Sequence, residues 1–295
     1  MKVILVAIVL VLAVSVTYGR QFMSIEDLTS YDYHRRIGMP EAARIKKLED
    51  EYLRSGNFSR IVGGSITDIS HVPYQTGLVI AMNGGGSSLC GGVLISTIRV
   101  VTAAHCHTDG NMSARSFTVV LGSNTVFSGG VRITTSDIAP HPQWNPRLAE
   151  NDIAVIRMRP VSTSNVIQPI ELPSGPELNN RFVDYLGLAS GYGRTANNAA
   201  IPANQRLSSV NLPILSDNTC RPIFGTWYHN TNICTSGAGG RGTCQGDSGG
   251  PLVVHSFGRR ILVGIVSYGH SSGCSGGFPA VYARVTSYVN WIVSQ

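Results

Sequence analysis

The chain of 295 residues contains few lysines: Lys2, Lys46 and Lys47 are all of them, and every later basic residue is arginine or histidine. Lysine loses its charge at about pH 10, whereas arginine keeps it. The use of arginine in place of lysine either keeps the surface cationic in alkaline fluid or reflects compositional drift. No basic run is interleaved with aromatic residues, so the net charge of +6 gives no support for nucleic acid as a partner.

Metal-binding patterns are also missing. The 6 cysteines include no C-x-x-C pair, which argues against a metal site built on that motif. The glycine-rich stretch Gly122–Gly130 has no aspartate or glutamate, and calcium needs such oxygen ligands. We therefore expect no metal and no other cofactor.

Long apolar runs are scarce outside the N-terminus. Val3–Val16 follows the basic Lys2 and precedes the small residues Thr17 and Gly19. This pattern is typical of a secretory signal peptide at residues 1–19, and the run is shorter than the about 20 residues that a membrane helix needs. The alternative is a membrane anchor. We expect a secreted, extracellular protein that forms disulfides and does not act on membranes.

Acidic residues are absent after Asp247, and this decides how the segment Cys244–Pro251 is interpreted. Within it, Gly246–Gly250 satisfies G-x-S-x-G, the nucleophile elbow of α/β-hydrolases, in which the acid follows the serine. Since no acid follows Ser248, that order is impossible here. One interpretation of the segment is a glycine-rich turn whose serine only forms local hydrogen bonds. If Ser248 is instead a catalytic nucleophile, the acid that completes its site must lie upstream.

Two upstream segments supply the missing partners. His105 follows the strand-like run Val93–Val101, and Asp152 precedes the apolar run Ile153–Ile156. A serine nucleophile needs a base, and an imidazole base needs an acid that fixes its tautomer. Either residue alone would be interpreted as structural. In this order with Ser248, they predict a catalytic triad.

The order and the surrounding motifs resemble those of the chymotrypsin-like serine proteases. The matching segments are Ile61–Gly64, Thr102–Cys106, Asn151–Ala154, Gly246–Pro251 and Ser267–Gly269. They extend from Ile61 to near the end of the chain. The chain looks most similar to the digestive chymotrypsin-like enzymes of insects, which implies a serine endopeptidase that acts through an acyl-enzyme in the gut lumen.

Residues 61–295 contain many short β-rich runs broken by glycine, proline and asparagine, a pattern that favours an all-β fold. The resemblance implies two six-stranded antiparallel β-barrels with the active site between them, in a monomer. Val285–Val293 has apolar residues at helical spacing and predicts a C-terminal helix.

The resemblance also implies how the cysteines pair. The implied disulfides are Cys90–Cys106, Cys220–Cys234 and Cys244–Cys274. A loop closed in this way contributes about 3 kcal/mol by restricting the unfolded chain. The first would hold the turn of His105, and the third would hold the loop of Ser248.

Residues 20–60 differ from the rest because they are charged, lack cysteine and include the helix-forming run Glu41–Leu53. We interpret them as a propeptide that a trypsin-like protease removes by cutting between Arg60 and Ile61. The alternative is an N-terminal arm that stays attached. Without a cysteine, the released segment would have no disulfide to hold it.

In the family that the chain resembles, such a cut frees an ammonium group that pairs with the aspartate before the nucleophile. The corresponding residues are Ile61 and Asp247. The pairing would order the backbone N–H groups of Gly246 and Ser248 into an oxyanion hole.

The same resemblance implies a specificity pocket framed by Gly242, Thr243, Gly269 and Ala280, with the strand from Ser267 to Gly269 binding the substrate backbone. Neither Gly242 nor Ala280 carries a charge, so we expect cleavage after Phe, Tyr, Leu or Met. Ala280 stands where glycine is usual in chymotrypsins, which leaves an elastase-like preference for small residues open.

Two other classes remain as alternatives. A catalytically silent binding protein of the same fold would usually have lost a triad residue, and a cascade protease would usually carry a disulfide-rich N-terminal module. The expected partners are therefore protein and peptide substrates, the activating protease and protein protease inhibitors. Asn57 and Asn111 lie in N-glycosylation sequons.

Overall fold

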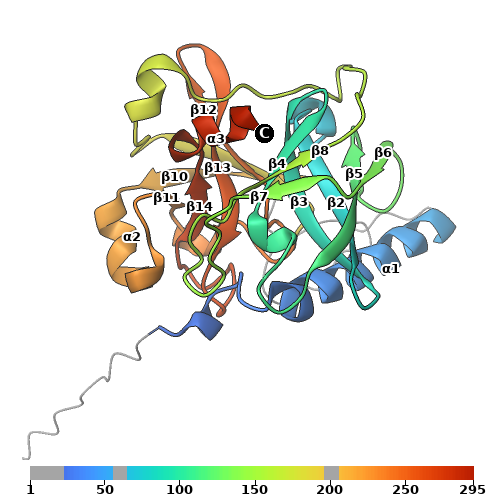
Figure 1. Cartoon of the computed structure of the whole chain (residues 1–295), viewed down its shortest axis with the longest axis horizontal. Coiled ribbons are helices and arrows are strands. Elements are labelled where there is room, and N and C mark those ends of the chain that lie inside the picture. The colour runs from blue at the N-terminus through green and yellow to red at the C-terminus, as the bar shows by residue number, and fades with distance from the viewer. Residues whose placement is uncertain (1–22, 56–64, 196–205) are drawn as a thin grey trace, which may run out of the picture.

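Two β-sheet bodies pack side by side, and the N-terminal part of the chain runs beneath both (Figure 1). The structure is a computed structural model that describes residues 23–55, 65–195 and 206–295. The predicted signal peptide, the bond between Arg60 and Ile61, and the sequon at Asn57 lie outside the described residues.

The first sheet is antiparallel and follows the order β6-β5-β2-β3-β4-β8-β7. Its strands are β2 (Gln75–Met82), β3 (Ser87–Ser96), β4 (Arg99–Thr102), β5 (Ala114–Leu121), β6 (Val131–Thr135), β7 (Ile138–Pro140) and β8 (Ala154–Arg157). No pairing joins the end strands β6 and β7 within the described residues, so this sheet curves without closing.

The second sheet is also antiparallel, in the order β1-β10-β11-β14-β13-β12-β9, and a further pairing of β10 with β9 closes six strands into a barrel. Its strands are β1 (Ser65–Ile66), β9 (Leu186–Gly191), β10 (Ser208–Leu215), β11 (Asn232–Thr235), β12 (Pro251–Ser256), β13 (Arg259–Tyr268) and β14 (Ala280–Arg284). The all-β prediction is confirmed. In detail, one barrel closes with six strands, while the other sheet has seven strands and stays open.

In the described ranges, three α-helices accompany the sheets: α1 (Met39–Ser55), α2 (Asp217–Phe224) and α3 (Val289–Ser294). The predicted C-terminal helix is present as a short 3₁₀ turn, Val285–Ser287, followed by α3. The run Glu41–Leu53 lies inside α1, as its composition predicts. Among the described residues, no helix is both long and apolar enough to cross a membrane.

The core explains why these strands form. β13 is buried from Ile261 to Tyr268 on both faces, since it lies between two neighbouring strands and beneath the other sheet. One continuous cluster of buried apolar side chains joins strands of both sheets, including Leu78 and Val101 from the first and Leu262 and Ile265 from the second. The two bodies therefore share a core.

Three disulfides are present: Cys90–Cys106, Cys220–Cys234 and Cys244–Cys274. These are the pairs that the resemblance implies. The first joins β3 to the 3₁₀ turn Ala104–Cys106, the second joins α2 to β11, and the third joins the loop before β12 to the loop before β14.

Candidate active site

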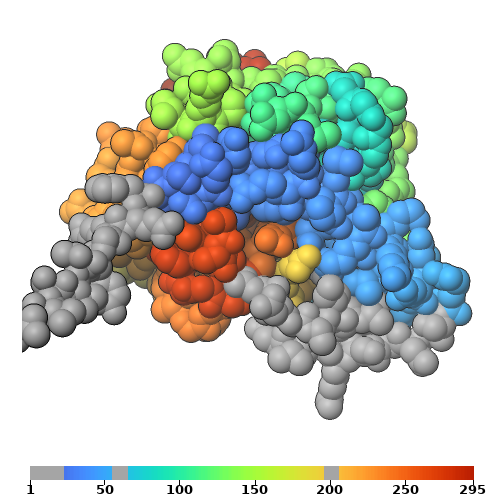
Figure 2. Space-filling view, turned by 90° about the horizontal axis from the view of Figure 1, so that it is seen from below, coloured from blue at the N-terminus to red at the C-terminus, as the bar shows by residue number. Residues whose placement is uncertain are grey.

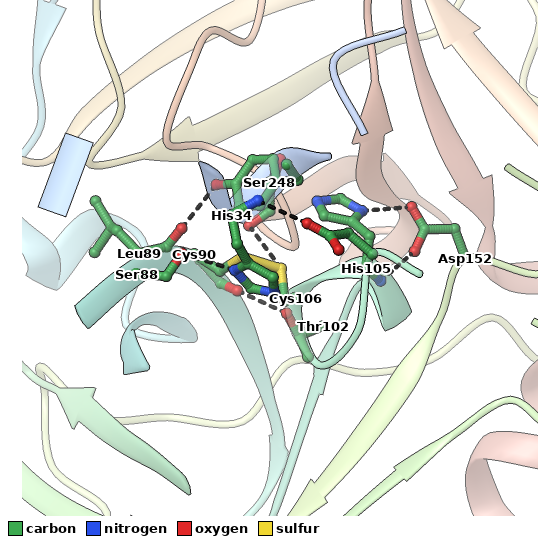
Figure 3. Close-up of a disulfide and its surroundings, with 12 residues drawn as sticks. His34, Ser88, Leu89, Cys90, Thr102, His105, Cys106, Asp152 and Ser248 are labelled. Atoms are coloured by element: carbon green, nitrogen blue, oxygen red, sulfur yellow. Dashed lines mark hydrogen bonds and ion pairs between the residues drawn. A yellow bond between two sulfur atoms is a disulfide. The ribbon is translucent and has the colours of Figure 1, made fainter. Parts of the chain in front are cut away.

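His105 and Asp152 meet at the edge of the first sheet (Figure 3). His105 lies in the 3₁₀ turn that follows β4, and Asp152 lies just before β8, the strand paired with β4. Nδ1 of His105 is 2.7 Å from Oδ2 of Asp152, and the backbone N–H of His105 donates to Oδ1 at 2.8 Å. Both side chains are buried, at 0% and 1% exposure. The carboxylate thus fixes both the position of the ring and which of its nitrogens carries the proton.

Asp152 has a third donor from the second sheet. The hydroxyl of Ser267, near the end of β13, donates to Oδ2 of Asp152 at 2.6 Å. Ser267 is fully buried. This bond ties the strand expected to bind the substrate backbone to the carboxylate that orients the imidazole.

Ser248 comes from the loop before β12, and two glycines allow that loop to approach the first sheet. Gly246 has φ +98° and Gly249 has φ +80°, backbone conformations that side chains rarely adopt. A Cβ on Gly249 would also lie 2.5 Å from the carbonyl oxygen of Gly91 in β3. In return, the N–H of Gly91 donates to the carbonyl of Ser248 at 2.7 Å. The loop is therefore fastened beside the turn of His105.

The hydroxyl of Ser248 is nevertheless not bonded to the base. Nε2 of His105 is buried and has no hydrogen-bond partner in the described part of the chain. The ring of Tyr33 stands edge-on to the imidazole, with 4.6 Å between ring centroids. Burial raises the pKa of Tyr33, and a hydrogen bond with the side chain of Ser248 partly opposes that rise. The structure brings the three predicted residues together, but a tyrosine from the N-terminal part of the chain lies among them.

A cleft of about 560 Å³, including its open mouth, adjoins Ser248. The residues expected to frame the pocket all line it, namely Gly242, Thr243, Ser267, Gly269 and Ala280. Its lining also includes Phe278, whose ring stacks on that of His270 with 4.2 Å between centroids. No aspartate, glutamate, lysine or arginine lines this cleft among the described residues.

Asp247 does not line this cleft, although it precedes Ser248 in the chain. Its carboxylate accepts from the backbone N–H groups of Gly193 and Cys244, each at 2.8 Å. Burial raises the pKa of Asp247 to about 6, although these two donors lower it. A buried carboxylate with only neutral donors is costly to ionise. Beside it lies a second cavity of about 550 Å³, including its open mouth, whose lining includes Gly193, Arg194, Arg241 and Asp247.

Within the part of the chain that the structure describes, Cys90, Cys106 and His105 form a group whose potential metal-ligand atoms lie within 4.8 Å of one another. Both sulfurs belong to a disulfide, so they are not available as thiolate ligands.

Comparison with known proteins agrees with this geometry. Residues 61–292 match the trypsin family. The chain belongs to the trypsin family. It is a serine endopeptidase of that family, and the part of the chain before Ile61 lies outside the match.

Individual relatives of the protease include proteins of Drosophila melanogaster and Hypoderma lineatum. It is 37% identical over 237 residues to serine protease 1 of Drosophila melanogaster, covering 79% of this chain and 84% of that protein. It is 36% identical over 240 residues to collagenase of Hypoderma lineatum, covering 81% and 87%. A solved structure of HL collagenase superposes with a TM-score of 0.72 at 34% identity, over 79% of this chain and 97% of that one.

Sequence reasoning missed the contribution of Tyr33 to the site of the protease, as well as those of Phe278 and His270. The contribution of Tyr33 depends on its contact with His105, a residue far from it in the chain. One local signal was available for Phe278, because it lies two residues before Ala280, which was expected in the pocket.

Proposed function

We propose that the protease is secreted as a zymogen, with residues 1–19 as signal peptide and 20–60 as propeptide. Cleavage between Arg60 and Ile61 by a trypsin-like protease would release the domain 61–295. The active enzyme hydrolyses peptide bonds after apolar or aromatic residues. Its expected setting is extracellular, in the gut lumen, where dietary protein and protein inhibitors are its partners.

The observation that carries the catalytic part is the buried hydrogen-bond network of His105, Asp152 and Ser267 beside Ser248. In the proposed mechanism, Nδ1–H of His105 is held by Asp152, which leaves the lone pair of Nε2 to take the proton of Ser248. The serine oxygen then attacks the substrate carbonyl, and the N–H groups of Gly246 and Ser248 stabilise the oxyanion. The substrate C–N bond then breaks as His105 gives that proton to the leaving amine, and the acyl group stays on Ser248. Water, which gives a proton to His105, attacks the acyl carbon, and the ester bond breaks to release the acid and restore the Ser248 hydroxyl.

Activation is supported by the surroundings of Asp247. Its carboxylate is buried with two backbone donors, and a cavity lies next to it. An ammonium group at Ile61 would supply the missing opposite charge there. Because Asp247 lies between Gly246 and Ser248, its position fixes the direction of both N–H groups of the oxyanion hole.

Replacing Asp247 with asparagine should therefore leave cleavage intact but disable the product. We expect kcat to fall by about 10²–10³, the cost of losing one oxyanion-hole donor. The measurement is kcat on a small peptide substrate after cleavage, with the new N-terminus confirmed by mass spectrometry. Full turnover by Asp247→Asn would contradict the activation mechanism.

A stability measurement on the uncleaved chain provides the control. Since the pKa of Asp247 is raised to about 6 on folding, the folded chain holds a proton between about pH 4 and pH 6 that the unfolded chain has released. The free energy of unfolding should fall as the pH rises through that window, by up to about 3 kcal/mol. In Asp247→Asn, this fall should be absent.

The proposed specificity depends on the uncharged cleft. Trypsins are among the relatives, for example trypsin alpha of Drosophila melanogaster at 39% identity over 241 residues. Preference for Arg or Lys does not follow from that likeness, because Gly242 offers no charge at the position from which trypsin-like enzymes attract them. Phe278 adds an aromatic surface, which favours apolar side chains.

Introducing a carboxylate at residue 242 should shift the preference of the protease from apolar residues towards Arg. A Cβ at Gly242 would meet no atom within 4 Å, so the backbone there has room for a side chain to begin, and Gly242→Asp is the substitution to make. We expect kcat/KM for Arg substrates to rise relative to Phe substrates by about a hundredfold. The matched control is Gly242→Asn, which has the same shape without the charge and should not change the ratio in this way.

The test of the whole proposal is to cleave the zymogen at Arg60 and to profile it on peptides that differ only at the residue before the scissile bond. Preferred release after Phe, Tyr, Leu or Met supports it. Release after Arg or Lys would overturn the pocket argument. Preference for Ala or Val would select the elastase-like alternative, which the methyl group of Ala280 favours.

A further inference from the structure

Residues 23–55, here called the N-terminal segment, cross the face that holds the cleft (Figure 2). The N–H of Thr29 donates to the carbonyl of Gly269 at 3.1 Å, and the N–H of Gly269 donates to the hydroxyl of Thr29 at 2.9 Å. Two residues along, the N–H of Ser271 donates to the carbonyl of Asp27 at 2.7 Å. The segment thus uses the backbone that the proposed function reserves for substrate.

The segment then enters the site itself. Tyr33 is fully buried against the imidazole of His105, it lines the cleft together with Ser248, and its hydroxyl donates to the carbonyl of Leu89 at 2.7 Å. The next residue, His34, is also fully buried, with Nδ1 at 2.8 Å from the hydroxyl of Ser88 (Figure 3). A substrate carbonyl and the ring of Tyr33 would need the same space.

Further along, two buried acids of α1 hold the segment to the protease domain. Glu41, 1% exposed, pairs with Arg194 at 2.6 Å. Glu49 accepts from the N–H groups of Val126 and Phe127 at 2.8 and 2.9 Å, and from the hydroxyl of Ser128. Charge-assisted bonds of this kind, removed from water, are stronger than ordinary hydrogen bonds.

The segment does not offer a peptide bond for cleavage where it meets the nucleophile. Tyr33 has helical backbone angles, φ −55° and ψ −48°, and it begins a π-helical stretch, His34–Gly38. Asp32 before it has φ +47°. The side chain of Arg36 fixes this turn by donating to the carbonyls of Leu28 and Tyr31. A substrate would lie extended at this point, so the segment binds there without being positioned for attack.

We propose that the N-terminal segment remains bound after the cut at Arg60 and acts as a separate polypeptide inhibitor of the protease domain. This inference rests on the proposed zymogen activation. Activity then has two requirements. The new terminus at Ile61 must order the oxyanion hole, and the N-terminal segment, which still covers His105 and Ser248 after the cut, must leave. Activity then appears only when the segment dissociates or is degraded.

The experiment uses the full chain with residues 56–60 replaced by the recognition sequence of a specific processing protease, so that Ile61 becomes the new N-terminus. Activity on a small peptide substrate is measured at three stages: after the cut at high protein concentration, after removal of the segment by gel filtration, and after adding the released segment back. We expect little activity at the first stage, a rise at the second and concentration-dependent inhibition at the third.

Two variants locate the inhibition in the site. Tyr33→Ala should raise the inhibition constant of the segment by about a hundredfold, since it removes a buried ring from the cleft. Tyr31→Ala is the matched control, because its ring lies beneath the guanidinium of Arg36 and outside the cleft lining. After separation, every variant yields the same residues 61–295, so equal activities at that stage show that the protease domain folded normally.

The outcomes separate the two proposals. Full activity at the first stage, with the segment either released or still bound, would overturn this inference and leave the proposed activation intact. A separated domain with a free Ile61 terminus and no activity would overturn the activation proposal itself. Equal inhibition by Tyr33→Ala and the unaltered segment would also overturn the inference.

Discussion

Replacing Ser248 with alanine in the processed enzyme is expected to lower kcat by about a million-fold, the loss measured when a serine protease loses its nucleophile. The side chain is small and 7% exposed, so the change leaves the packing almost unaltered. The measurement is kcat after cleavage and removal of the N-terminal segment, with the melting temperature recorded in parallel.

Ser294→Ala provides the control for that loss. Ser294 lies at the exposed end of α3, where its hydroxyl donates to the carbonyl of Trp291 and accepts from the side-chain amide of Gln295, far from the triad. It should retain normal turnover. A second comparison uses His105→Ala combined with Ser248→Ala, which should be no slower than Ser248→Ala alone, because the two residues act as a unit. A loss below tenfold in Ser248→Ala would exclude Ser248 as the nucleophile.

Asp152→Asn should lower kcat by about 10⁴ through the orientation of His105. The carboxylate accepts three hydrogen bonds: two from His105 and one from Ser267. An asparagine side chain has one acceptor oxygen and an NH₂ group, so it cannot satisfy all three donors. If the NH₂ group faces Nδ1, the imidazole must move its proton to Nε2, which then cannot act as the base.

The matched control for this change is Asp137→Asn. Asp137 is 57% exposed and pairs with Arg157 on the surface at 2.8 Å, and such pairs contribute little. Asp137→Asn should leave kcat within about twofold of that of the unaltered enzyme, as expected for a surface change. A loss in Asp152→Asn that is no larger than in this control would mean that Asp152 does not orient the base.

The order of His105, Asp152 and Ser248 was predictable because chemistry restricts the combinations. A serine needs a base, the base needs an acid, and the absence of acids after Asp247 allows only one side of the chain for the partners. The all-β class followed from the short runs and their turn residues. The open edge of the first sheet was not predictable, since strand pairing depends on contacts across many residues.

The buried face of α1 illustrates the other limit. Glu41, Ile45 and Glu49 are spaced by four, so they lie on one face of the helix. A sequence pattern assigns such acids to solvent, yet all three residues are buried. Their partners, Arg194 and the backbone near Val126, come from distant parts of the chain. Only the folded arrangement shows that this face binds the protease domain.

The cavity beside Asp247 has a consequence for labelling chemistry. All three lysines precede Ile61, so a domain cut at that residue would contain one primary amine, its own N-terminus. A reagent that acylates amines would then report on a single group. The rate at which the reagent acylates this amine would distinguish an Ile61 terminus that is free in solvent from one that is enclosed against the carboxylate of Asp247. No lysine would contribute to the measured rate.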